Sequence, residues 1–267
     1  MRMFKSIALA AMTLVAVAFS VAPAPAAELR VLISGGLTAA FKELAPEFER
    51  ATGHHLTAAY GPSMGTTENA IPQRLARGEP ADVLIMVGDA LGKLIDQGKA
   101  VASTRVDLVR SPIGLCVRAG APKPDIGTPD ALRAALLKAK SIAYSDSASG
   151  VYVQGQLFVR LGIEDEMKGK APMIPAEPVA AVVARGEAEL GFQQVSELLP
   201  VAGADLVGPI PAEVQKITVF SAAVATNSQS PDAAKAFIAF LASAAAAPVL
   251  KKAGLDPIAV TTGHGQK

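Results

Sequence analysis

The sequence predicts an α/β fold of two lobes, each a mixed, mostly parallel sheet flanked by helices. The main observation is a plan that occurs twice. An apolar strand at residues 29–33 passes through Ser34-Gly35-Gly36 into an amphipathic helical pattern at 39–50. Over residues 141–161 the same order recurs, with a strand at 141–144, a turn of small residues at 145–150 and a helix at 151–161. Two such units in a chain of 267 residues leave room for two cores.

A short repeat supports the same division. The tetrapeptide Ala-Arg-Gly-Glu occurs at 76–79 and again at 184–187, each time between a helical pattern and an apolar strand. Alone it is an ordinary helix end in an alanine-rich chain. Together with the repeated strand, turn and helix, it indicates two lobes of similar topology whose turns can face one another.

The remaining elements follow from local patterns. Apolar runs bounded by Gly and Pro predict buried strands, and apolar residues three and four apart predict helices. Ser111-Pro112 predicts a change of course within the strand material of 106–117, and a helix is expected to begin at Thr66 or Thr67. The other predicted strands are 55–60, 81–87, 188–193 and 217–225, and the other helices are 90–97, 130–139, 179–184 and 231–245.

The N-terminal residues predict export. Arg2 and Lys5 precede an apolar run at 7–21, and small residues follow it up to Ala26. This order is typical of a secretory signal peptide, here residues 1–26, cleaved after Ala26. A membrane anchor is the alternative, but the apolar run is short for a span. No cysteine lies near the cut, so we expect a free soluble protein and not a lipoprotein. We also expect a periplasmic monomer without stable membrane insertion.

Composition excludes several classes of function. The 25 basic and 24 acidic residues nearly balance, and tryptophan is absent, which argues against a nucleic-acid partner. Three histidines and one cysteine do not cluster at ligand spacings, so no metal is expected. The same scarcity leaves no Ser/His/Asp or Cys/His set for a hydrolase. Cys116 lies in an apolar run and is expected to be a buried hydrophobe.

Both small-residue turns are suited to an anion. A strand that feeds a helix through small residues leaves the first N–H groups of that helix unpaired, at the positive end of its dipole. Hydroxyl groups at Ser34, Ser63, Thr66 and Ser149 add neutral donors near these turns. The pattern therefore predicts a small negatively charged ligand between the lobes.

The residues also carry a family resemblance, which covers nearly the whole chain after the signal peptide. The matching segments are 34–38, 74–83, 145–150, 191–194, 237–241 and 252–255. In these segments the chain resembles periplasmic solute-binding proteins of the molybdate-binding type. The resemblance implies a type II fold, with lobe 1 formed by 27–110 and 217–267 and lobe 2 by 111–216. It further implies a two-strand hinge with crossings near Ser111 and Lys216.

The ligand positions depart from that family's pattern. Gly36 stands where the family has a serine, the loop from Gly61 to Gly65 replaces a serine-rich loop, and Gln194, beside Gln193, replaces a tyrosine. Two adjacent amides and a wider loop suit a ligand whose carboxylates are separated by carbon. The predicted ligand-binding residues are Ser34, Gly35, Gly36, Ser63, Met64, Gly65, Thr66, Ser147, Ser149, Gly150, Gln193 and Gln194.

A branch of the same family, the periplasmic aconitate isomerases, is enzymatic. Similarity to it implies an allylic proton shift between cis- and trans-aconitate, with no metal or organic cofactor. The alternative is the substrate-binding component of an ABC importer for molybdate or a similar oxyanion, with a permease as partner. The departures at Gly36 and Gln194 favour the small polycarboxylate and the isomerase.

An isomerase needs a base, and the sequence leaves its identity open. His54 and His55 are expected to be a solvated pair at a helix–strand junction. The candidates are Asp146, Glu68, Tyr152 and Glu177. Each has a structural alternative: Asp146 can cap a helix, Glu68 can favour a helix start, and Tyr152 can fill the lobe interface.

Overall fold

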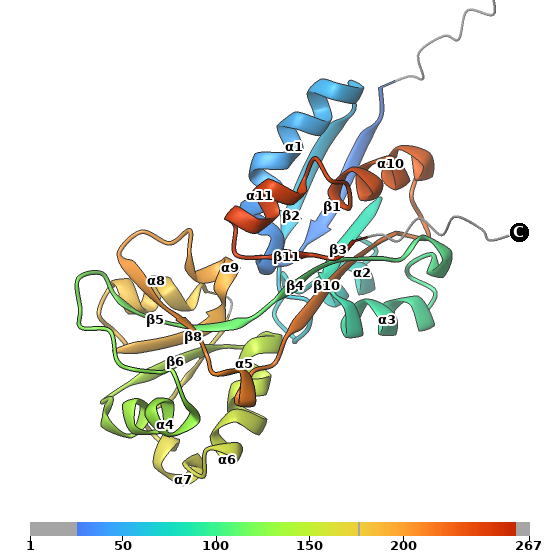
Figure 1. Ribbon diagram of the computed structural model, residues 1–267. Coiled ribbons are helices and arrows are strands. Elements are labelled where there is room, and N and C mark those ends of the chain that lie inside the picture. Colours follow the sequence, from blue (N-terminus) through green and yellow to red (C-terminus); the bar gives the residue numbers. More distant parts are fainter. Residues whose placement is uncertain (1–25, 176, 260–267) are drawn as a thin grey trace, which may run out of the picture.

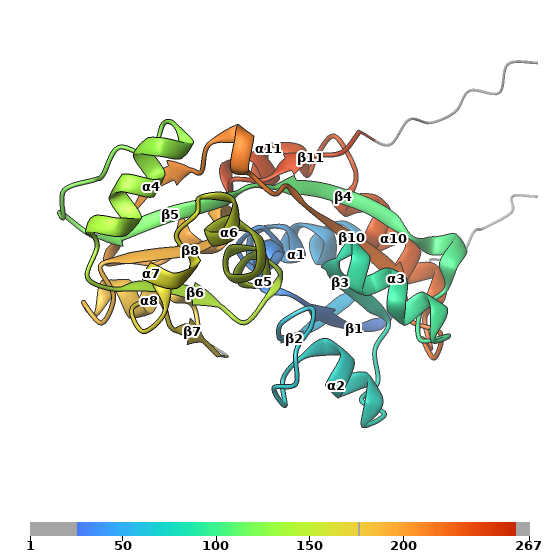
Figure 2. The ribbon, with the colours of Figure 1, turned by 90° about the horizontal axis from the view of Figure 1, so that it is seen from below.

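The computed structural model describes residues 26–175 and 177–259, so the predicted signal peptide lies outside it except for its last residue. Two α/β lobes lie side by side and are joined by long strands (Figure 1). Figure 2 shows the same two bodies from below, with α1 (Thr38–Thr52) directed at the junction between them. No helix in this part of the chain is long and apolar enough to cross a bilayer.

The first lobe is built on a six-stranded sheet with the order β11-β4-β10-β3-β1-β2. Its central strand β3 is buried at every residue, as expected for a strand covered by helices on both faces. The strands are β1 (Glu28–Ile33), β2 (His55–Tyr60), β3 (Val83–Val87), β4 (Val106–Ser111), β10 (Thr218–Val224) and β11 (Asp256–Pro257). The helices are η1 (Gly35–Leu37), α1, α2 (Ile71–Ala76), α3 (Gly88–Asp96), η2 (Ala102–Thr104), α10 (Pro231–Leu241) and α11 (Ala247–Lys252).

The second lobe is built on a five-stranded sheet with the order β7-β6-β8-β5-β9. Its strands are β5 (Ile113–Arg118), β6 (Ile142–Ser145), β7 (Met173–Ile174), β8 (Leu190–Gln194) and β9 (Ala204–Pro209). Its helices are α4 (Pro129–Lys138), α5 (Ala148–Tyr152), the π-helical turn η3 (Val153–Leu157), α6 (Phe158–Arg160), α7 (Glu164–Met167), α8 (Val179–Ala184), α9 (Val195–Leu198) and η4 (Ala212–Val214).

The α/β fold of two sheet-and-helix lobes is therefore confirmed, but the sheets are less parallel than expected. In the first, β1 pairs in parallel with β2 and β3, whereas β10 is antiparallel to β3 and β4. In the second, β6 is parallel to β7 and β8, and β5 is antiparallel to β8 and β9. The antiparallel strands β4, β5, β9 and β10 lead to or from the crossings between lobes, where the chain direction reverses, and β11 is antiparallel to β4 as well.

Two further local expectations need correction. The helix expected from Thr66 or Thr67 begins only at Ile71, because Pro72 occupies its first turn and residues 63–69 form bends and turns. The helix expected at 151–161 begins earlier, at Ala148, and widens into the π-helical turn η3 before α6. The strand β9 has no counterpart among the expected elements.

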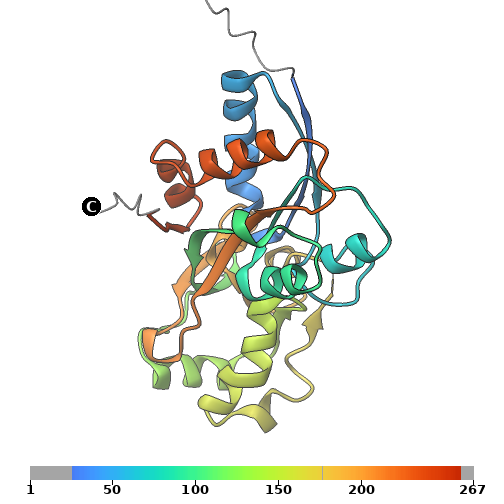
Figure 3. The same cartoon turned by 90° about the vertical axis from the view of Figure 1, so that its right-hand side faces the viewer.

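The chain crosses between the sheets twice (Figure 3). Pro112 separates β4 from β5, and the return passes through η4 to β10. Gln215 braces the two segments, because its Oε1 accepts from the N–H of Ile113 at 2.9 Å and its Nε2 donates to the oxygen of Ile113 at 3.0 Å. The two crossings are thus fastened to each other beside the junction of the lobes.

Each lobe has its own apolar core. In the first, α1 packs on α10 through aromatic rings, with the Phe48 and Phe237 centroids 5.0 Å apart. In the second, Tyr144 and Phe158 meet edge to face at 6.0 Å. Cys116 is fully buried in a smaller cluster around α8, and burial raises the pKa of its thiol to about 12. Cys116 is therefore an inert core residue, as its sequence context predicted.

Candidate functional site

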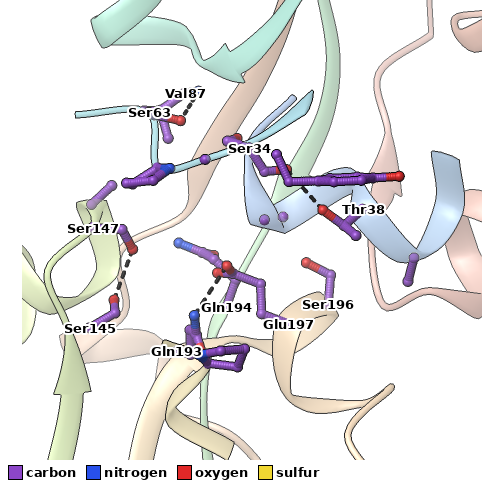
Figure 4. A pocket seen from close by; sticks show the side chains of 18 of the residues that line it. Ser34, Thr38, Ser63, Val87, Ser145, Ser147, Gln193, Gln194, Ser196 and Glu197 are labelled. Carbon is purple, nitrogen blue, oxygen red and sulfur yellow. Dashed lines mark hydrogen bonds between the residues drawn. The ribbon is translucent and has the colours of Figure 1, made fainter. Parts of the chain in front are cut away.

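A cavity of about 380 Å³ lies between the lobes and is lined from both sides (Figure 4). Its volume is in the range that holds small organic ligands. From the first lobe it is lined by Ser34, Gly35, Gly36, Thr38, Ala39, Lys42, Tyr60, Gly61, Pro62, Ser63, Asn69, Val87 and Phe220. From the second it is lined by Ser145, Asp146, Ser147, Ala148, Glu177, Pro178, Gln193, Gln194, Ser196, Glu197, Pro200 and Val201.

The first-lobe wall is the turn between β1 and α1. The backbone N–H of Ser34 donates to the oxygen of Ile85 at 2.9 Å, which fixes the start of the turn to the middle of β3. The chain then winds through η1 into the 15 residues of α1, and the N–H of Thr38, the first residue of α1, donates to the oxygen of Gly35. Gly35, Gly36, Thr38 and Ala39 line the cavity, so the positive end of the helix dipole lies beside it. At Gly36 a Cβ atom would lie 2.3 Å from Cζ of Phe220, so only glycine fits beneath this ring.

The second-lobe turn is ordered by its own hydroxyls. Oγ of Ser145 lies 2.8 Å from Oγ of Ser147 and 3.1 Å from Oγ of Ser149. A Cβ at Gly150 would lie 1.5 Å from the oxygen of Ser145. Ser149 and Gly150 are buried beneath the turn and do not line the cavity, whereas Ser147 does.

Three buried hydroxyls, those of Ser34, Thr67 and Ser196, lack a partner in the part of the chain that the structure describes, and two of them line the cavity. Oγ of Ser34, at the end of β1, and Oγ of Ser196, in the first turn of α9, make no hydrogen bond there. The residues are 3% and 1% exposed, and both line the cavity from opposite lobes. A buried hydroxyl normally finds a partner. Their orphaned state is explained if a ligand between the lobes supplies the missing hydrogen bonds.

Glu197 lines the cavity but was not among the residues predicted from the sequence. It is the third residue of α9 and is partly buried in the cavity wall. Nε2 of Gln193 donates to its Oε1 at 3.1 Å, and the backbone of Gln194 also hydrogen-bonds its carboxylate. Loss of solvent is the main cause that raises the pKa of Glu197 to about 7, the two hydrogen bonds oppose the shift, and the charge of Asp146 adds to it. The carboxyl is thus poised to gain or lose a proton near neutral pH.

The sequence contained only a weak signal for this residue. Glu197 follows Gln193-Gln194 after an apolar strand, at the third helical position, where a glutamate commonly reaches back to the N-cap. Its contact with Gly35 across the lobe junction joins residues far apart in the sequence, so no local pattern predicts it. A Cβ placed on Gly35 would lie 2.0 Å from Oε1 of Glu197, so this carboxylate rests against the opposite turn.

Lys42 supplies a positive charge that was also missed. It lies one turn into α1, and its Nζ is 5.6 Å from the centroid of the Tyr60 ring. Both residues are exposed and line the cavity. Among the described lining residues, Lys42 is the only lysine or arginine. Its exposed side chain, one helical turn after the start of α1, places this charge at the rim of the cavity.

Several predicted residues lie elsewhere. Met64, Gly65, Thr66 and Glu68 belong to the turns after β2 and do not line the cavity. Tyr152 is buried in the core of the second lobe, where its hydroxyl donates to the oxygen of Val214 and accepts from Arg160. Tyr152 is therefore placed as a packing residue.

Three other candidates reach the cavity but have structural partners. Ser63 lines it, yet its Oγ accepts the N–H of Val87 at 2.9 Å. Glu177 also lines it, and its carboxylate is bound by Nη1 and Nη2 of Arg185. Asp146 lies in the turn after β6 and faces the cavity, close enough to influence Glu197.

Gln194 differs in role from its neighbour. With the amide oriented so that both ends are satisfied, its nitrogen donates to Oγ of Ser111 at 3.0 Å and its oxygen accepts from Oγ1 of Thr218 at 2.9 Å. Ser111 and Thr218 are paired residues of the two crossing strands. Gln194 thus connects the floor of the cavity to the crossings, and Gln193 connects it to Glu197.

The described residues contain no cluster of three or more His, Cys, Asp or Glu side chains arranged to hold a metal ion. The chemistry that the cavity offers is that of neutral hydroxyl and amide donors, one cation and a carboxyl group of raised pKa. Such a set can hold carboxylates and move a proton.

Comparison with known proteins agrees with this arrangement. A family described as bacterial extracellular solute-binding protein matches residues 29–256. The chain is 54% identical to an aconitate isomerase from Pseudomonas sp. over 234 residues, covering 88% of this chain and 89% of that protein. It is 27% identical to the molybdate-binding protein ModA of Azotobacter vinelandii over 239 residues, covering 86% and 90%.

The solved structure of the periplasmic molybdate-binding protein of Azotobacter vinelandii has the same fold, with a TM-score of 0.67 and 21% identity. It covers 85% of this chain and 98% of that one. The resemblance found in the sequence to molybdate-binding-type solute-binding proteins, including their aconitate isomerase branch, is confirmed.

Proposed function

Because this chain belongs to the bacterial extracellular solute-binding protein family, we propose that it closes its two lobes on a small organic polycarboxylate. We further propose that it is an aconitate isomerase, which shifts an allylic proton to interconvert cis- and trans-aconitate. The observation that carries the proposal is the pair of orphaned hydroxyls, Ser34 and Ser196, which face one cavity from opposite lobes. The 54% identity to an aconitate isomerase supports the choice of substrate.

The donors suit a ligand with separated carboxylates. Ser34 and the turn at Gly35 are placed for one carboxylate, Lys42 for another at the rim, and Ser196 for a third group on the second lobe. The predicted contacts Gly35, Gly36, Ser147 and Gln193 also line the cavity. The volume of about 380 Å³ accommodates a carbon skeleton between these points.

The second candidate is a binding component for molybdate or a similar oxyanion, serving an ABC permease. The 27% identity to ModA and the neutral hydroxyls favour it. Three carboxyl groups line the cavity, those of Asp146, Glu177 and Glu197, against the single cation of Lys42. Their charge opposes both anions and does not separate molybdate from aconitate, whereas the cavity volume of about 380 Å³ suits the larger polycarboxylate.

Two measurements on the purified protein test the proposal. Thermal unfolding should shift upward by several degrees with millimolar cis- or trans-aconitate and remain unchanged with molybdate or tungstate. Proton NMR of cis-aconitate with the protein should then show trans-aconitate accumulating. A melting temperature that rises with molybdate alone, together with an unchanged NMR spectrum, would support the importer instead.

The remaining expectations belong to the same proposal. The protein is exported to the periplasm with cleavage after Ala26, and acts there as a monomer without a resident cofactor. Lobe 1 (27–110 and 217–267) and lobe 2 (111–216) close about the crossings near Ser111 and Lys216. N-terminal sequencing of the periplasmic protein and light scattering test these points, and a start other than Ala27 or a stable dimer would contradict them.

A further inference from the structure

Resting on the proposed isomerase activity, we propose that Glu197 is the general base that takes the allylic proton and delivers it to the other end of the double-bond system. Glu197 was absent from the candidates that the sequence offered. Its carboxylate is placed by α9 at the junction of the lobes, against the Gly35 turn and among the cavity-lining residues. A ligand bound to the Gly35 turn is therefore brought next to this carboxylate.

The carboxylate is held in a defined orientation. Gln193 donates to Oε1 of Glu197 at 3.1 Å, and the amide oxygen of Gln193 is itself fixed by the N–H of Val179 at 3.0 Å. The backbone of Gln194 provides a second hydrogen bond to the carboxylate. All these partners belong to the second lobe, so the base is held in place by its own lobe.

The other acidic groups at the cavity are less suited to the task. Glu177 is engaged by the guanidinium of Arg185 through both of its oxygens. Glu68 and Tyr152 do not line the cavity. Asp146 faces Glu197 from the turn after β6, and its negative charge favours the protonated form of Glu197. Asp146 is thus placed to raise the pKa of the proposed base Glu197. Lys42, at the rim of the same cavity, carries a charge of the opposite sign.

The proposed step conserves atoms and electrons. An oxygen of Glu197 forms a bond to the proton of the substrate's methylene carbon, and that C–H bond breaks. Its electron pair becomes the new double bond to the central carbon, while the electrons of the old double bond form a C–H bond at the far carbon with the proton from Glu197. No oxidant, reductant or leaving group is required.

The charge that develops during this transfer is spread onto the substrate's carboxylates. The hydroxyls of Ser34 and Ser196 and the ammonium group of Lys42 are available to stabilise it. The pKa of Glu197, raised to about 7 mainly by loss of solvent, lets the same group accept and return the proton near neutral pH.

The test compares wild-type protein with Glu197→Gln, which preserves the size of the side chain, and with Glu166→Gln, an exposed change in the second lobe. Isomerisation of cis-aconitate is followed by proton NMR and binding by calorimetry. Glu197→Gln should bind cis-aconitate with affinity of the same order as wild type and lose at least about 100-fold in kcat. Glu166→Gln should match wild type, and circular dichroism should show that both variants are folded.

The outcomes separate the two proposals. If wild type isomerises aconitate and Glu197→Gln does so at a comparable rate, the assignment of the base is overturned and the proposed function stands. If wild type binds but does not isomerise, both proposals fall together. Asp146→Asn provides a further readout, since removal of its charge should lower the pKa of Glu197 and move the acidic limb of the pH profile downward. A kcat loss in Asp146→Asn as large as in Glu197→Gln would assign the base to Asp146.

Discussion

The amide of Gln193 joins two elements of the second lobe, with Nε2 donating to Oε1 of Glu197 at 3.1 Å and Oε1 accepting from the N–H of Val179 at 3.0 Å. Since Val179 begins α8 and Glu197 lies in α9, one side chain sets the relation between two short helices at the cavity. Both ends of the amide are occupied, so its orientation is fixed. This relationship makes Gln193 a positioning residue for Glu197.

Replacement of Gln193 by methionine should therefore change the pH profile. The hydrogen bond from Gln193 lowers the pKa of Glu197, so its loss should raise that pKa above its value of about 7. The acidic limb of kcat/KM against pH should then move to higher pH, because the base must be ionised to accept a proton. Gln156→Met, on an exposed face, is the matched control. An unchanged limb in Gln193→Met would mean that this hydrogen bond does not tune the base.

Glu197 should make the protein less stable as the pH rises. Its folded-state pKa of about 7 lies above its ordinary value of 4.5, so the folded protein binds more protons than the unfolded chain between these pH values. The free energy of unfolding therefore falls across this interval by up to about 3 kcal/mol from this residue.

Urea unfolding of wild type and Glu197→Gln measures that contribution. The stability advantage of Glu197→Gln should be small at pH 4 and should grow until about pH 8, because glutamine cannot ionise. Glu166→Gln should follow wild type throughout. A constant difference between wild type and Glu197→Gln would show that Glu197 titrates at its ordinary pKa.

Lys42→Gln should weaken the binding of polycarboxylates. Lys42 is the only cation among the described cavity-lining residues, and it lies at the exposed rim. Loss of one charge-assisted contact should reduce the affinity for cis-aconitate about tenfold, and the difference should shrink at high salt. Lys93→Gln, on the outer surface of α3, is the control. Calorimetry that shows equal affinities for Lys42→Gln and wild type would remove Lys42 from the site.

Gly36 and Phe220 should behave as a coupled pair. A serine at position 36 would place its Cβ 2.3 Å from Cζ of Phe220, which is only 3% exposed. Gly36→Ser should therefore lower the melting temperature and abolish ligand binding. Phe220→Leu should restore much of the stability in the double variant because it removes the colliding atoms. Strictly additive losses in a double-mutant cycle would contradict this coupling.

Gln194→Leu should act at the crossings between the lobes. The buried amide of Gln194 lies between Ser111 and Thr218, and leucine at this position would remove the hydrogen bond that each of their hydroxyls makes with it. Thermal unfolding should show that the free energy of unfolding falls by about 1–3 kcal/mol. Gln229→Leu, which changes an amide near the start of α10, is the comparison. Wild-type stability in Gln194→Leu would show that this amide is not a structural bond of the crossings.

The sequence by itself determined the repeated order of strand, small-residue turn and helix, because these elements follow from local apolar periods and from Gly and Ser at the turns. Of the ligand-binding residues that it predicted, Ser34, Gly35, Gly36 and Ser147 line the cavity. The helix start predicted at Thr66 or Thr67 was wrong, because Pro72 delays the helix to Ile71, and Thr66 and Glu68 lie in turns outside the cavity.

Tertiary structure alone decided which titratable groups face the cavity. Tyr152 and Glu197 are both in helices that follow a strand of the second lobe, yet one packs into the core and the other faces Gly35. The raised pKa of Glu197 depends on loss of solvent where the lobes meet. Desolvation is a property of everything packed around a group, and these neighbours come from distant parts of the chain, so no local pattern in the sequence records it.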